Sequence, residues 1–126
     1  MPQTCQIYFF YDWGCDSPFW CGNDAARTQF DVGPIAPETL GCSAQTSAAI
    51  RALAEWHDAA LNWNYPPDPV PWRQAECDRF NAALEALLDR IRAELSEDYE
   101  LIDKQRRFTE DPDLDRYLAD PKGFRR

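Results

Sequence analysis

The chain has 126 residues, of which 22 are acidic and 13 basic, and its formal net charge is −9. The length favours one domain, and a hydrophobic content of 44% is enough for a core, which excludes global disorder. The charge argues against nucleic acid as a direct partner, because phosphate binding needs clustered Lys and Arg. No stretch is long and apolar enough for a membrane span, and residues 1–5 lack signal-peptide character, so we expect a cytoplasmic protein.

The first half of the chain predicts strands joined by an irregular loop. Residues 4–12 are rich in β-branched and aromatic residues and contain no Gly or Pro, which is typical of a strand. Both of its faces are apolar, so we expect it to be central in the sheet. A loop over 13–27 follows, and the alternation at 28–32 predicts a short second strand paired with the first. Pro37–Leu40 is expected to form a single helical turn.

Two amphipathic helices are predicted next. The first is capped by Ser43 or Thr46 and continues to about residue 63, where a run of prolines ends it. The second extends from about residue 72 to 96, with a continuous apolar stripe at helical spacing. Residues 99–102 then predict a further strand, extending toward residue 107.

These elements predict an α+β fold in the order β-(β)-α-α-β. In this fold a small antiparallel sheet of two to three strands packs against an antiparallel pair of helices. Residues 1–107 are expected to form this single domain. Residues 108–126 form a polar C-terminal extension, with a short helix expected over 113–119.

Three segments resemble a family of small, acidic, uncharacterised actinobacterial proteins. Tyr11-Asp-Trp-Gly-Cys-Asp-Ser-Pro-Phe-Trp20 is similar to a Tyr-Gly-Cys-Asp-Pro-Leu-Trp-like segment that follows the family's first strand. Ile50-Arg-Ala-Leu-Ala-Glu-Trp-His-Asp-Ala-Ala-Leu-Asn62 is similar to the family's first helix. Ala93-Glu-Leu-Ser-Glu-Asp-Tyr99 is similar to the end of its second helix. The resemblance implies the order strand, two helices, strand in an intracellular bacterial protein, and it implies no particular activity.

The sequence contains no recognisable catalytic motif. His57 is the one histidine, and its place on the apolar side of the first helix favours a buried structural role over that of a general base. The acids of the second helix mostly have basic neighbours at helical spacing, which is typical of a solvated helix face. We therefore favour a protein that is not an enzyme and that needs no cofactor.

The five cysteines are widely spaced. The closest two, Cys15 and Cys21, have five residues between them, a longer gap than in the usual zinc-binding pairs. We therefore predict no metal site and expect reduced, mostly buried thiols. Cys15 and Cys21 remain a possible thiol pair, either as a disulfide under oxidising conditions or as reactive groups.

Acidic and aromatic residues gather near the N-terminus. Residues 1–50 hold five acids and one base, and aromatic residues lie among the acids. Aromatic anchors surrounded by acids suit a basic protein surface. The predicted partner-binding residues are Asp12, Trp13, Asp16, Phe19, Trp20, Asp24 and Asp31.

We therefore predict a non-enzymatic protein-binding inhibitor, of an immunity or antitoxin type, directed against a basic protein partner such as a toxin. One alternative is a small thiol-dependent enzyme or redox protein. Another is a homodimeric accessory protein paired through its aromatic strand, so both a monomer and a homodimer remain open. An acidic surface that serves only solubility would also explain the charge.

Overall fold

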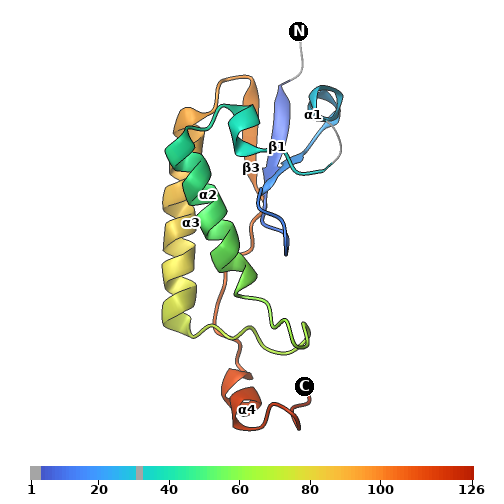
Figure 1. The fold of residues 1–126 in the computed structure, drawn as a ribbon, viewed down its shortest axis with the longest axis vertical. Coiled ribbons are helices and arrows are strands. Elements are labelled where there is room, and N and C mark those ends of the chain that lie inside the picture. The colour runs from blue at the N-terminus through green and yellow to red at the C-terminus, as the bar shows by residue number, and fades with distance from the viewer. Residues whose placement is uncertain (1–3, 31–32) are drawn as a thin grey trace.

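The computed structural model describes residues 4–30 and 33–126, and it contains one three-stranded sheet with two long helices on one side (Figure 1). The strands are β1 (Cys5–Phe9), β2 (Phe19–Cys21) and β3 (Tyr99–Asp103), in the order β2-β1-β3. The predicted α+β class and the central position of the first strand are therefore confirmed.

The sheet is mixed, whereas the sequence predicted an antiparallel one. β1 pairs antiparallel with β2 and parallel with β3. Each of the two helices reverses the direction of the chain, so β3 enters the sheet from the same end as β1. It pairs with the edge of β1 that β2 leaves free. Strand patterning shows that a strand exists, but it does not show which edge the strand joins.

The second strand lies earlier in the chain than predicted. Residues 28 and 29 end a short helix, α1 (Asp24–Gln29), while 31 and 32 lie outside the described residues. The Asn23 side chain caps α1 by accepting a hydrogen bond from the Ala26 backbone N–H at 3.0 Å. β2 occupies part of the segment predicted as a loop, and Ile35 forms a bridge with Phe19 beside it.

The two long helices are antiparallel, as predicted. After a 3-10 turn at Pro37–Leu40, α2 (Ala44–Asp58) descends in Figure 1 and α3 (Gln74–Glu94) ascends beside it. The Ser43 side chain caps α2, and the Glu94 carboxylate at the end of α3 accepts hydrogen bonds from the Ser43 N–H and the Thr46 hydroxyl. α2 ends at Asp58, earlier than predicted, where the Trp63 indole N–H donates to the Asp58 carbonyl at 2.7 Å.

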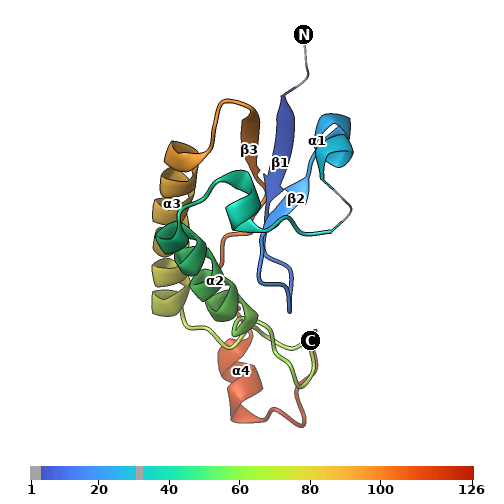
Figure 2. The same ribbon diagram turned by 45° about the horizontal axis from the view of Figure 1, so that its top comes forward.

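The C-terminal extension follows β3 and contains a short helix, α4 (Leu114–Ala119), at the end of the molecule opposite the N-terminus (Figures 1 and 2). Asn81 on α3 exchanges two hydrogen bonds with the Phe108 backbone, at 2.8 and 3.0 Å. The Arg126 guanidinium contacts the Asp111 carboxylate at 2.9 Å. These contacts hold the extension in a defined place against α3 and within itself.

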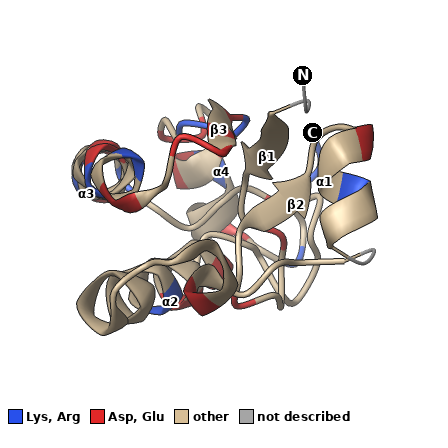
Figure 3. Cartoon of the chain, turned by 90° about the horizontal axis from the view of Figure 1, so that it is seen from above, with Lys and Arg blue, Asp and Glu red and all other residues tan. Residues whose placement is uncertain are grey.

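The core fills the space between the sheet and the helices. Alternate residues of β1 are buried, as are the inward stripes of α2 and α3, and no helix of the described chain is long and apolar enough to cross a membrane. Figure 3 shows acidic and basic residues side by side on α3, so its outer face is largely charge-balanced. The fully buried large side chains are Ile7, Phe9, Phe19, Ile50, Phe80, Leu84, Leu88, Ile91, Phe108 and Leu114.

Candidate functional site

Residues 10–18, between β1 and β2, carry several of the predicted binding residues and are fixed by Tyr11. The buried Tyr11 hydroxyl donates to the Ile50 carbonyl on α2 at 2.9 Å, and the Tyr11 N–H donates to the Gln105 side chain at 2.7 Å. Burial also raises the pKa of Tyr11 far above its usual range. The loop is therefore held between α2 and the segment after β3.

A tight turn then brings Trp13 over α2. The Cys15 N–H donates to the Asp12 carbonyl at 3.1 Å, and Gly14 has a φ of +79°, which favours glycine. The Gly14 N–H donates to the Asp58 carboxylate at 3.0 Å. Trp13 stacks on His57, with ring centroids 4.1 Å apart. The turn is thus attached to α2 by a hydrogen bond and by ring stacking.

An acid-rich groove of about 190 Å³ lies between this turn and α2. The groove contains three acids, Asp16, Glu55 and Asp58, and one base, Arg51, whose charge is shared with Glu38 outside the groove. The Asp16 side chain is 80% exposed, and its carboxylate is 3.9 Å from Arg51 Nε. We call the surface formed by Gly14, Cys15, Asp16, Arg51, Ala54, Glu55 and Asp58 the acidic groove.

A second hollow, of about 280 Å³, lies on the other side of Trp13. Five aromatic or imidazole rings and two cations line it, so its charge is opposite to that of the groove. We call this surface the aromatic hollow; it is lined by Phe10, Tyr11, Trp13, His57, Lys104, Gln105, Arg106 and Phe108.

His57 is part of the packed wall of this hollow. It is 3% exposed, and burial lowers its pKa to about 4, so the ring is neutral near pH 7. Its Nδ1 is buried without a hydrogen-bond partner in the described structure. The buried Cys77 thiol donates to the Trp72 carbonyl at 4.0 Å.

The remaining predicted binding residues are distributed over different parts of the fold. Phe19 is fully buried, so it supports the surface from below and does not reach a partner. Trp20 stacks on Phe10 at 5.2 Å, and its indole N–H donates to the Phe10 carbonyl. Asp24 is exposed on α1 and pairs with Arg27 at 2.6 Å, while Asp31 lies outside the described residues. The predicted residues that meet at one place are therefore Asp12, Trp13 and Asp16.

The acids of α2 were not identified as binding residues from the sequence. Arg51, Glu55 and Asp58 share the polar side of the helix, and that periodicity was the available signal. The sequence could not show that the turn at 12–16 packs beside this side. Nothing in the sequence marked Lys104 and Arg106 as binding residues, because basic residues after a strand are common on protein surfaces.

None of the five cysteines, all of which lie in the described residues, forms a disulfide. Burial raises the pKa of Cys21 and Cys77, and it raises that of Cys42 to about 11. A nucleophilic cysteine needs the opposite shift. In the described residues, no group of three or more His, Cys, Asp or Glu side chains is arranged to hold a metal ion.

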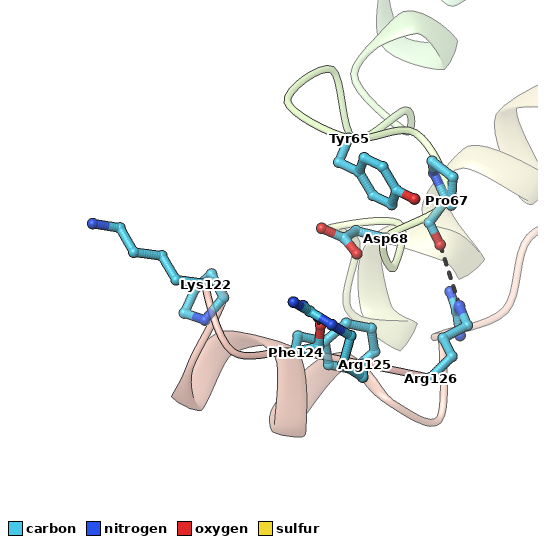
Figure 4. A pocket seen from close by; sticks show the side chains of 8 residues that line it. Tyr65, Pro67, Asp68, Lys122, Phe124, Arg125 and Arg126 are labelled. Carbon is cyan, nitrogen blue, oxygen red and sulfur yellow. Dashed lines mark hydrogen bonds between the residues drawn. The ribbon is translucent and has the colours of Figure 1, made fainter.

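A third cavity, of about 530 Å³, lies between the loop after α2 and the C-terminal residues (Figure 4). Tyr65 and Pro67 form one wall, and Arg126 crosses to the Pro67 carbonyl at 3.2 Å. We call this cavity the tail cleft; it is also lined by Asp68, Pro121, Lys122, Phe124 and Arg125.

A small mixed sheet covered by an antiparallel helix pair, with charged surfaces built on one loop, defines the chain as an α+β protein with candidate protein-binding surfaces. Residues 5–104 match the family model of the Serratia CdiI immunity protein-like proteins, and the chain belongs to this family. No curated protein matches the chain. The match includes the acidic groove and ends before Gln105, so most of the C-terminal extension and the tail cleft's basic side lie outside it.

Proposed function

We propose that this protein is an immunity protein that neutralises a toxin by binding it. Its membership of the CdiI immunity protein-like family carries the proposal, since the name of that family describes immunity proteins. The two surfaces beside Trp13 support it because they offer charged and aromatic groups for a protein contact. A cytoplasmic location and a bacterial host belong to the same proposal.

We further propose that the acidic groove and Trp13 contact a basic surface of the toxin. Asp16 and Glu55 are exposed, and Arg51 is the single cation among the residues that line the groove. Charges at the rim of an interface act mainly by steering association and by excluding unsuitable partners. Trp13, next to Gly14 of the groove, supplies apolar area for the contact, and tryptophan is common among the residues that dominate binding energy.

The thiol-dependent enzyme is the weaker alternative. The pKa of Cys21, Cys42 and Cys77 is raised by burial, which leaves these thiols protonated and unreactive near pH 7. The homodimeric accessory protein remains a prediction, and light scattering over a range of concentrations tests it directly.

The experiment compares two double variants with the same change in net charge. Asp16→Lys with Glu55→Lys reverses the groove, whereas Asp89→Lys with Glu97→Lys reverses two exposed acids on α3 and just after it. If a toxin-like reading frame adjoins this chain's gene, binding to the domain that it encodes is measured at low and high salt, together with growth of cells that co-express that domain. We expect the groove variant to bind roughly 10- to 100-fold more weakly at low salt and to protect poorly.

The matched variant at Asp89 and Glu97 should protect like the wild type. Equal losses in both double variants would show that only net charge matters and would contradict the groove as the contact. If the wild-type chain itself neither binds nor neutralises the toxin, the immunity function is wrong.

A further inference from the structure

The aromatic hollow is lined by two exposed cations, Lys104 and Arg106, and by aromatic rings. Among the described residues, neither Lys104 nor Arg106 forms an ion pair, although the chain carries an excess of nine acids. Arg107, between them and α3, contacts the Asp103 carboxylate at 2.7 Å and also pairs with Glu85. Asp103 and Glu85 thus pair with Arg107, while Arg106 acts on Asp111 only through its longer-range charge, which helps to lower the pKa of that carboxyl.

Both cations are held over aromatic rings. The Lys104 ammonium lies 5.2 Å from the centre of the Tyr8 ring, and the Arg106 guanidinium lies 4.8 Å from that of Phe108. Such contacts orient a cation without cancelling its charge. They place two positive groups at the rim of the hollow while leaving them available to an incoming anion.

The wall of the hollow is rigid and has few polar groups to offer. Gln105 is buried, and its amide is occupied by the Tyr11 N–H and the Arg106 carbonyl. Phe108 is 1% exposed, and Trp13 is fixed by its stacking on His57. His57 is 3% exposed and has an unpartnered Nδ1. A guest would therefore meet the half-buried rings of Phe10 and Trp13 below two exposed cations, with His57 and Phe108 packed behind them.

We propose that this hollow receives a carboxylate side chain, Asp or Glu, of the toxin. Arg106 and Lys104 would bind the carboxylate, and the methylene groups of the guest would lie against the half-buried rings of Trp13 and Phe10. The volume of about 280 Å³ suits one side chain and is too small for an element of secondary structure. This inference rests on the proposed immunity function.

The toxin is the favoured source of that carboxylate because the hollow and the acidic groove share the Trp13 loop. A partner that covers Trp13 would meet acids on one side and cations on the other. Opposite charges on adjacent surfaces fix the orientation of a partner and discriminate against one that is uniformly basic. The cognate toxin should therefore present an acid next to its basic patch.

The test replaces Arg106 by Glu and compares it with Arg79→Glu, an exposed cation on α3 that forms no ion pair among the described residues. Both changes alter the net charge equally. With a basic toxin, the extra negative charge of Arg79→Glu should leave affinity unchanged or slightly higher. We expect Arg106→Glu to weaken binding at least tenfold, and Arg106→Lys to retain most of the affinity.

Arg106→Gln, which removes the charge without introducing an acid, is the second variant if Arg106→Glu does not fold. The inference is overturned if Arg106→Glu, or Arg106→Gln in its place, binds the toxin as well as Arg79→Glu does. In that case a loss in the Asp16 and Glu55 variant would leave the proposed function intact. Failure of the wild-type chain to bind the toxin would instead reject both.

Discussion

The two sides of Trp13 differ in where their charges come from. Two of the three acids of the groove, Glu55 and Asp58, come from α2, and Asp16 comes from the turn. Arg51 is the one basic residue that lines the groove with them. The cations of the hollow come from the segment after β3 and are held over aromatic rings. The loop at residues 13–16 therefore contributes to two surfaces of opposite charge, and its position determines the shape of both.

The largest effect is expected from Trp13→Ala, because Trp13 lines the aromatic hollow and directly precedes Gly14 of the acidic groove. We expect toxin affinity to fall roughly 100-fold or more, as for a central aromatic residue of an interface. Isothermal titration calorimetry measures the change. Tyr65→Ala is the control, since Tyr65 is 58% exposed and lines the distant tail cleft. Equal losses in the two variants would remove the special role of Trp13.

The second prediction concerns pH and the wall of the hollow. Burial lowers the pKa of His57 to about 4, against about 6.5 in the unfolded chain. The unfolded state therefore takes up the proton first, and stability is lost as the pH falls from 6.5 to 4. The loss expected from this one group is about 3 kcal/mol.

Denaturant unfolding of the wild type and of His57→Phe at several pH values isolates this contribution. The free-energy curves of the two proteins should diverge across that window, because the variant lacks the titrating group. Parallel curves would contradict the assignment. Trp13→Ala should raise the pKa of His57 toward 6.5, and NMR can follow this readily because the chain has one histidine.

A smaller effect is expected from Gly14→Ala, which strains the turn between the two surfaces. The φ of +79° is unfavourable for alanine, and no atom lies within 4 Å of the added Cβ, so the cost is conformational, about 1 kcal/mol. Gly41→Ala imposes similar strain at a φ of +90° outside the Trp13 loop. Both variants should lose similar stability in thermal unfolding, but only Gly14→Ala should weaken toxin binding.

The smallest effect is expected from Arg51→Ala. Arg51 is the cation of the acidic groove, and its ion pairs with Glu38 and Asp16 are solvent-exposed. Removal should barely change the melting temperature, because exposed ion pairs contribute little. Affinity for a basic toxin should stay the same or rise roughly two- to threefold. A clear loss of affinity would indicate that Arg51 itself contacts the partner.

Local patterns account for the two long helices and for the strands β1 and β3. The apolar stripe of residues 77–95 predicted α3, and Ser43 marked the start of α2 correctly. The alternation at 28–32 was misleading because Asn23 caps a helix just before it. Phe19 and Trp20 were assigned to a loop, yet three residues suffice for a strand when β1 supplies the hydrogen-bonding edge.

The sequence also selected part of the candidate site. Asp12, Trp13 and Asp16 lie together because they are close in the chain, and a tight turn holds them. Glu55 and Asp58 on α2, and Lys104 and Arg106 after β3, are about 40 to 90 residues away from that turn. No local pattern relates such distant positions, since their proximity depends on how the elements pack.

The sequence by itself determined the class of the fold, the two amphipathic helices and the acidic character of the N-terminal half, because these follow from composition and periodicity. The tertiary structure alone decided that β3 joins β1 in parallel and that the turn at Trp13 rests on His57. It also decided that acids and cations end on opposite sides of that ring. The physical reason is that the choice of sheet edge and the packing of side chains depend on contacts between distant segments. No single segment determines the energies of those contacts.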